Sequence, residues 1–269
     1  MEFITILSII LILSVAFIIS PLGLGGGVLY VPILHYMLGW HLEEALLGSL
    51  TLVLMVAIGS SLAHKKGGYA DKALANKGRI SAIPGAIIGP ILGWMFITYI
   101  DEMVIKVIAA LILVFVIERT IRRSIKESKT ELPPVDRKSK LTSYRFGTMF
   151  AATIAGLLGI GGGAILVMIH RSLIGMDVRE AAGTSYLIEM TIIPIALLTH
   201  IIIDGSLPGI IETNGLLPLI LIPLLACGCA VFGAKFSIAY VPRKYITTAF
   251  ITAVSISLIR YIIDFANLL

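Results

Sequence analysis

A glycine-rich stretch, Gly23-Leu-Gly-Gly-Gly27, interrupts an apolar segment near the start of the chain, and it returns as Gly159-Ile-Gly-Gly-Gly163. A short apolar segment follows each stretch, 28–38 in the first case and 164–174 in the second. As a helix, such a segment is about 16 Å long, well under the roughly 30 Å hydrocarbon core of a bilayer. Paired glycine breaks followed by half-length helices are typical of carriers with internal repeats, where they mark the substrate site.

The composition indicates a helical membrane protein. Of the 269 residues, 58% are hydrophobic and 14% are charged, and the mean hydropathy is +1.00. Apolar runs of about 20 residues recur along the chain, which predicts an all-α polytopic membrane protein. The net charge of +5 comes from basic residues in short loops between apolar runs. It therefore does not indicate binding to nucleic acid.

Enzyme signatures are missing from the sequence. There is no phosphate-binding P-loop and no HExxH pair, and neither glycine stretch lies in a strand–turn–helix unit, so neither is a dinucleotide fingerprint. Cys227 and Cys229 are two residues apart in an apolar segment, and residues at that spacing do not share a helix face. We expect no enzyme activity, no cofactor and no metal site.

The chain is an internal duplication. When residues 22–50 are shifted by 136 positions, eleven of 29 residues are identical, including the glycines of the break. A basic stretch, which contains Pro133-Pro134, separates the two copies. We predict an N-terminal transmembrane repeat at 1–118, a basic cytoplasmic linker at 119–143 and a C-terminal transmembrane repeat at 144–269.

The distribution of charge predicts the topology. Basic stretches favour the cytoplasmic side, which places residues 64–79, the linker and Arg243-Lys244 inside. The acidic stretches, at 43–44, 101–102 and 204–212, then lie outside. The segment 144–174 must leave and return on the inside, and by symmetry 3–38 does so on the outside. Each half is then a broken, re-entrant helix pair plus three transmembrane helices, and the two repeats are inverted. The alternative is that 3–20 crosses the membrane by itself.

The two breaks predict an anion site near the membrane midplane. The half-helices that begin at about Val28 and Ala164 present unpaired N–H groups and partial positive charge at their N-termini. Hydroxyl groups shortly after each half-helix add donors. The predicted substrate-binding residues are Gly23, Gly25, Gly26, Gly27, Val28, Ser49, Thr51, Gly159, Gly161, Gly162, Gly163, Ala164, Thr184 and Ser185. The alternative is that the glycines serve only close helix packing.

Two charged residues extend this hypothesis. Glu189 lies well inside a predicted span, and its counterpart in the first repeat is Val53. An acid within the membrane is a candidate for proton coupling, and the alternative is a carboxylate hydrogen-bonded to a neighbouring helix. Arg171, at the end of the second half-helix, is a candidate guide for the anion. The alternative is that its side chain reaches the lipid headgroups.

Several motifs carry a family resemblance. The stretch Pro21-Leu-Gly-Leu-Gly-Gly-Gly-Val-Leu-Tyr-Val-Pro32, its second copy and Pro84-Gly-Ala-Ile-Ile-Gly-Pro-Ile-Leu-Gly93 resemble the TauE/SafE family, the sulfite exporters or toluene-sulfonate uptake permeases. The resemblance covers nearly the whole chain. The second copy departs from it, with Met168 in the place of Pro32, which weakens the transfer of any role for that proline.

The resemblance implies a secondary carrier in the cell membrane. Its substrates would be small sulfur-containing anions, such as sulfite or organosulfonates including sulfoacetate, moved by an ion or substrate gradient. The expected partners are the sulfur oxyanion and the lipid bilayer, and the sequence leaves a homo-oligomer open. Two other functions also remain open: a passive anion channel of the same architecture, and a membrane scaffold without transport.

Overall fold

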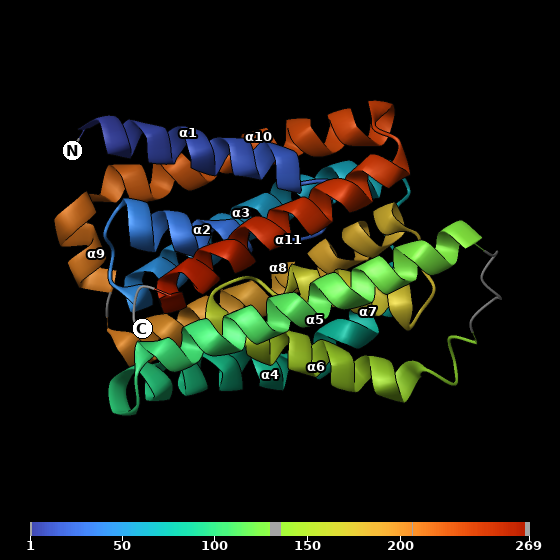
Figure 1. The fold of residues 1–269 in the computed structure, drawn as a ribbon, viewed down its shortest axis with the longest axis horizontal. Helices are drawn as coiled ribbons and strands as arrows, with labels where there is room; N and C mark the ends of the chain where they lie inside the picture. Colours follow the sequence, from blue (N-terminus) through green and yellow to red (C-terminus); the bar gives the residue numbers. More distant parts are fainter. Residues whose placement is uncertain (1, 130–135, 206, 267–269) are drawn as a thin grey trace.

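The computed structural model describes residues 2–129, 136–205 and 207–266, which form helices joined by short turns (Figure 1). In chain order the helices are α1 (Glu2–Ile19), α2 (Gly27–Pro32), the π-helical turn η1 (Ile33–Met37), α3 (Leu42–Lys66), α4 (Lys72–Tyr99), α5 (Glu102–Lys129), α6 (Leu141–Leu158), α7 (Gly163–Ser172), α8 (Val178–Asp204), α9 (Leu207–Asn214), α10 (Leu216–Tyr240) and α11 (Arg243–Ala266). The predicted all-α fold is confirmed.

Each broken helix pair returns to the end of the bundle at which it began (Figure 1). At what we call the linker end, Arg137, just before α6, binds both Asp71 and Glu180, and Glu180 follows α7. At the opposite end, the start of α1 and the loop after η1 line one cavity, through Thr5 and Trp40. The two hairpins therefore enter the bundle from opposite ends.

Each of the main contacts between two helices has a counterpart between the corresponding helices of the other half. Helix α4 packs along α6, and its counterpart α10 packs along α1. Helices α3 and α10 pack together as α8 and α4 do, and α3 packs on its own counterpart α8. The pairs α2 with α11 and α7 with α5 follow the same rule. A twofold relation between the halves gives this pattern, and inversion across a membrane remains a prediction.

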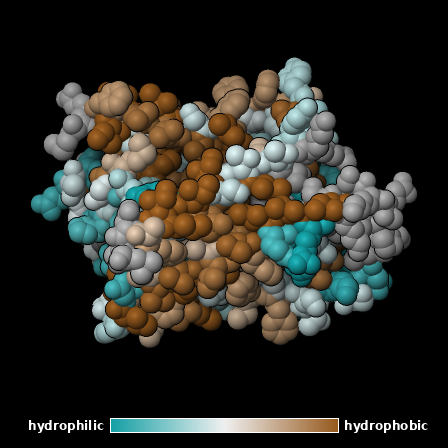
Figure 2. All heavy atoms as spheres, in the orientation of Figure 1, coloured by the Kyte–Doolittle hydropathy of each residue, from teal (hydrophilic) through white to brown (hydrophobic). Residues whose placement is uncertain are grey.

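Charge divides between the two ends of the bundle. The basic stretches at 64–79 and 243–244 lie at the linker end (Figure 1). The acidic stretches at 43–44 and 101–102, and residues 204–205 and 207–212, lie at the opposite end (Figure 1). In the view of Figure 2, hydrophobic residues cover most of the middle, and hydrophilic residues lie mainly toward the two ends. An apolar belt between two polar ends is the surface that a bilayer requires.

Four of the helices within the described residues are long and apolar enough to cross a membrane, namely α3, α4, α8 and α10. Helices α5 and α11 have 28 and 24 residues, about 42 and 36 Å at 1.5 Å per residue. By length they complete the predicted three spans of each half. Helix α1, with 18 residues, ends at the first glycine break.

Two helices are longer than the hydropathy pattern predicts. Helix α4 begins at Lys72, not near residue 80, because the Asp71 carboxylate accepts from the Leu74 N–H at 2.9 Å and caps the helix. Helix α5 runs to Lys129, so the first part of the predicted linker is helical. Residues 136–140 form a turn, and the predicted linker at 130–135 lies outside the described residues.

Helix α4 approaches α6 through three glycines spaced four residues apart. A Cβ atom on Gly85 would meet the Met149 carbonyl oxygen, and one on Gly89 would lie 3.0 Å from the Leu157 nitrogen. Gly93 faces the Leu157 carbonyl oxygen, 3.1 Å from its own Cβ position. The backbones of α4 and α6 touch because no side chain stands between them, the usual way to pack membrane helices.

We expect Gly89→Ala to destabilise the protein by about 1–3 kcal/mol, because the added methyl group overpacks the α4–α6 contact. Gly228 follows Pro223 in α10 at the spacing at which Gly89 follows Pro84 in α4, and it has no atom within 4 Å of its Cβ position. Gly228→Ala should be neutral or stabilising, because alanine favours a helix over glycine by about 1 kcal/mol. Thermal unfolding of both variants in detergent measures the difference, and equal losses would contradict the packing account.

Candidate functional site

The two glycine breaks have the same backbone conformation. Gly23, Gly25 and Gly26 have φ of 77°, 67° and 95°, and their counterparts Gly159, Gly161 and Gly162 have φ of 66°, 82° and 76°. This is the left-handed region, which costs other residues about 1–2 kcal/mol. Six glycines are therefore required by the backbone itself, and the duplication seen in the sequence is also a duplication of structure.

The breaks meet in the interior of the bundle. A Cβ atom on Gly27 would lie 2.5 Å from the Ile160 Cα atom, and one on Gly163 would lie 2.8 Å from the Leu24 carbonyl carbon. Gly25 and Gly161 both contact Val53, at the middle of α3. We call the two breaks, 23–27 and 159–163, together with Val53 and Glu189, the junction. The glycines pack closely in this conformation, so any contact with an anion requires the loops to separate. Whether they also contact substrate stays a prediction.

Both half-helices begin at the junction. The Gly26 carbonyl accepts from the N–H groups of Leu29 and Tyr30 at 2.9 and 3.0 Å, and the Gly162 carbonyl accepts from Ile165 and Leu166 at 3.1 and 3.0 Å. Val28 and Ala164, in the first turns, are buried. The first residue of each half-helix, Gly27 or Gly163, therefore lies against the break of the other half.

The half-helices differ where their sequences differ. Pro32 has no N–H for the Val28 carbonyl, and the Ser257 hydroxyl of α11 donates to that carbonyl at 2.7 Å instead. The π-helical turn Ile33–Met37 starts directly after the proline. With Met168 at the matching position, α7 stays α-helical to Ser172. The α-helix therefore gives way to a π-helical turn at Pro32, and it continues where Met168 stands in its place.

The predicted hydroxyl groups separate into two sets. The Ser49 hydroxyl, buried in α3, donates to the Gly159 carbonyl at 2.7 Å and so fixes the second break. Thr51, two residues along, donates to the Leu47 carbonyl of its own helix at 3.0 Å. It lines an apolar cavity of about 510 Å³ at the opposite end, away from the junction.

The hydroxyls of α8 serve protein contacts. Thr184 accepts from the Asp71 N–H at 3.1 Å, at the linker end. Ser185 donates to the Ala181 carbonyl at 2.8 Å and is hydrogen-bonded to His170 Nδ1 at 2.9 Å. His170 Nε2 lies 3.2 Å from the Tyr144 hydroxyl. Neither His170 nor Tyr144 is among the residues predicted from the sequence. A histidine within an apolar half-helix is the signal that points to His170.

Glu189 faces the junction from the middle of α8. Its side chain is fully buried, and neither carboxylate oxygen has a hydrogen-bond partner among the described residues. Oε1 lies against Gly163, the first residue of α7, and Oε2 is 3.3 Å from the Cβ position of Gly25. Gly163 begins a neighbouring helix, so proton coupling and the alternative of a carboxylate held by a neighbouring helix both stay predictions. The carboxyl group contacts both breaks.

Arg171 lies inside the protein and not at its lipid-facing surface. It is 6% exposed, at the end of α7. Together with Arg119 of α5 it lines a cavity of about 10 Å³ near the linker end, of which Val167 is another wall. Val167 packs against Gly23 of the first break. Arg171 is therefore buried, whereas Arg119, which lines the same cavity, is exposed.

The fold and the junction define the class of protein: a multi-pass α-helical membrane protein whose interior is built on two glycine breaks. The chain belongs to the sulfite exporter TauE/SafE family, whose sequence model matches residues 8–261. Membership makes it a membrane transport protein of a family that is not enzymatic, with a small anion as the substrate class. No curated protein and no solved structure matched the chain.

We expect Ser49→Ala to cost about 1–3 kcal/mol of stability, because it leaves the buried Gly159 carbonyl without its donor. Thr51→Val is the matched control two residues along the same helix. It removes a bond within α3 only, so its cost should be under about 1 kcal/mol. Thermal unfolding in detergent compares the two variants. If Thr51→Val lowers the free energy of unfolding as much as Ser49→Ala does, the hydrogen bond from Ser49 to Gly159 adds no more stability than a bond within α3.

Proposed function

We propose that the protein is a secondary carrier of small sulfur oxyanions, such as sulfite and organosulfonates including sulfoacetate. The observation that carries the proposal is the junction, where two glycine breaks of matching left-handed backbone meet and two half-helices begin. Helix N-termini bind anions through free N–H groups and the helix dipole. The family supplies the sulfur chemistry of the substrate.

Binding at the junction requires the two hairpins to move apart. Most of the break glycines, among them Gly27 and Gly163, pack against backbone or side chains of the other half, so this conformation is closed around the junction. Hairpins that enter from opposite ends of the bundle give the two movements that alternating access needs, one opening toward each end. Substrate bound between the breaks is then exposed to one side at a time.

Glu189 is the proposed site of proton coupling. Its carboxyl group lies against the N-terminus of α7, where the anion is expected to bind. An unpaired buried carboxylate is costly and would repel the anion, whereas the protonated acid does neither. Proton and anion should therefore bind together. Val53 stands at the matching position of the other half. The coupling of proton and anion would therefore depend on the single carboxyl group of Glu189.

The arginines of the linker end form the proposed anion route on that side. Arg171 and Arg119 line a cavity whose Val167 wall touches the first break, and two positive charges there raise the local concentration of an anion. Because basic loops favour the cytoplasm, we assign the linker end to the cytoplasm of a cell whose plasma membrane holds the protein.

Uptake of radiolabelled sulfite and sulfoacetate into proteoliposomes tests the function. A carrier exchanges external label against internal unlabelled substrate and accumulates it when driven by a gradient. A passive channel dissipates the gradient without such counterflow. No flux of any sulfur oxyanion, from protein that is folded and correctly reconstituted, would contradict the proposal and favour the scaffold.

We expect Glu189→Gln to abolish the stimulation of uptake by an inward proton gradient while exchange of sulfite against sulfite continues. Glutamine has nearly the same shape and stays neutral, so it mimics the protonated acid permanently. Arg171→Gln is the companion variant and should raise KM several-fold without changing the proton dependence. Uptake measured with and without the gradient separates the two effects. Retained proton stimulation in Glu189→Gln would rule out coupling at this residue.

A further inference from the structure

A buried tyrosine hydroxyl faces the first glycine break without a hydrogen-bond partner. Tyr30 of α2 is fully buried, and its hydroxyl oxygen lies 2.9 Å from the Cβ position of Gly26. Among the described residues, none is hydrogen-bonded to this hydroxyl. A buried hydroxyl without a partner is costly inside an apolar bundle. Native folds rarely keep such a group unless it has a function or binds a ligand.

Other buried polar side chains lie around the Tyr30 hydroxyl. Tyr186 of α8 is close enough to Tyr30 and to Glu189 for an electrostatic interaction with each. The Tyr186 hydroxyl donates to the Ile19 carbonyl at 3.3 Å, where α1 ends. The His64 ring, from α3, lies 5.7 Å from the Tyr186 ring, and its Nε2 also lacks a partner within the described part of the chain. The first break is therefore bordered by polar side chains of α2, α3 and α8.

The repeated backbone does not require these phenol groups. With the shift of 136 positions that matches the two repeats, Tyr30 corresponds to Leu166 and Tyr186 corresponds to Leu50. Both leucines are buried in the hydrophobic core. Matching positions of the two halves thus carry phenol groups in one case and alkyl groups in the other. Packing of the fold alone therefore does not explain a hydroxyl at Tyr30.

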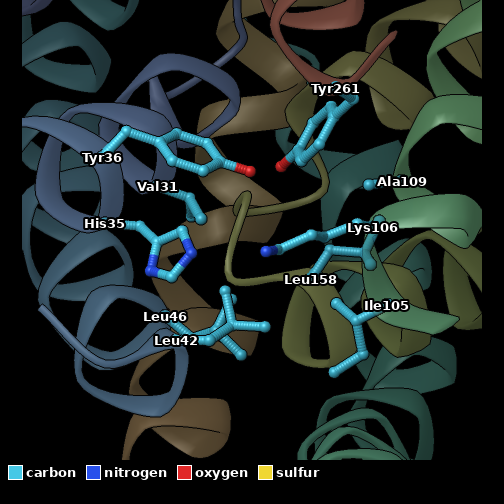
Figure 3. A pocket seen from close by; sticks show the side chains of 10 residues that line it. All are labelled: Val31, His35, Tyr36, Leu42, Leu46, Ile105, Lys106, Ala109, Leu158 and Tyr261. Carbon is cyan, nitrogen blue, oxygen red and sulfur yellow. The ribbon is translucent and has the colours of Figure 1, made fainter. Parts of the chain in front are cut away.

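A different pair of tyrosines belongs to another part of the bundle. Figure 3 shows Tyr36 and Tyr261 with Lys106 around a small cavity, which lies at the opposite end and encloses about 10 Å³. This cavity approaches the second break through the apolar side chains of Leu46 and Leu158. Its tyrosines are therefore separate from the polar side chains that border the first break.

We propose that the Tyr30 hydroxyl donates a hydrogen bond to the anion at the junction. A phenol O–H rotates to suit its acceptor, so it can turn toward an anion when the two hairpins separate. The protonated carboxyl group of Glu189, which lies against Gly163, is a second neutral donor. Two O–H donors from different helices suit an anion with several oxygen atoms around one centre. This inference rests on the proposed function and names one donor of that site.

Two tyrosine variants should give opposite results in thermal unfolding and in isothermal titration with sulfite at constant ionic strength. Tyr30→Phe removes a hydroxyl without a partner in this conformation, so its Tm should equal or exceed that of the wild type. Its Kd for sulfite should rise about tenfold or more, because a hydrogen bond to a charged group is lost.

Tyr144→Phe is the matched control, a second fully buried tyrosine. Its hydroxyl donates to the Leu74 carbonyl at 3.3 Å and lies 3.2 Å from His170 Nε2, at a distance from the junction. We expect Tyr144→Phe to lower Tm and to leave Kd unchanged. Uptake by Tyr30→Phe should keep its stimulation by a proton gradient, which separates this residue from Glu189.

Three results would overturn the role of Tyr30. The first is an equal Kd in the wild type and Tyr30→Phe, and the carrier function still stands if sulfite uptake persists. The second is a Tm of Tyr30→Phe far below that of the wild type, because the hydroxyl would then serve the fold itself. The third is wild-type protein that neither binds nor transports a sulfur oxyanion, which would overturn the proposed function as well.

Discussion

The contact between two glycine breaks is the constraint on which the rest of the structure depends. Irregular backbone inside an apolar bundle must find hydrogen-bond partners within the protein. The Ser49 hydroxyl serves the second break, and the Ser257 hydroxyl serves the carbonyl that Pro32 leaves without a partner. Because glycines fill most positions of the breaks, the two loops can approach one another closely. A side chain at Gly27 or Gly163 would meet backbone of the other break.

The two halves are alike in backbone and different in chemistry. Glu189 and Val53 occupy matching positions against the junction, one acidic and one apolar. Arginines line the cavity on the linker side, whereas Lys106 and two tyrosines line the pocket at the opposite end. The two halves therefore share a backbone arrangement but differ in side chains. Glu189 at the junction can titrate whereas Val53 cannot, and the cavities at the two ends of the bundle have different linings. The proposed coupling of an anion to a proton would rest on this difference, because only one half places a carboxyl group at the junction.

The breaks, the hairpins and the division of charge were readable from the sequence because their signals are local. A run of glycines, a short apolar segment and a basic loop each occupy adjacent residues. The roles of Ser49 and Thr51 could not be separated in this way, although they are two residues apart, because their difference depends on the rotation of α3. The hydropathy pattern also predicts a start of α4 near residue 80, which is too late. The first residues of the helix are polar, and hydropathy does not detect that Asp71 caps it.

The small cavity lined by Lys106, Tyr36 and Tyr261 could not be predicted from the sequence for a different reason. It joins η1, α5 and α11, which lie far apart in the sequence, and only the packed bundle brings Tyr36 and Tyr261 to the same lysine. His170 and Tyr144 meet in the same way, across α6 and α7. Helix positions follow from periodicity, but the pairing of faces between distant helices is a tertiary property. The family resemblance gave the substrate class, which no single residue in the sequence specifies.

The most direct test of the central claim is to locate a bound anion by anomalous scattering. Selenite has the shape and charge of sulfite and carries a strong anomalous scatterer, so crystals grown with it report the position of the anion. The account predicts a peak between residues 25–27 and 161–163, beside the first turns of α2 and α7. Selenite ordered elsewhere in the bundle, with the junction closed and empty at saturating concentration, would contradict the account.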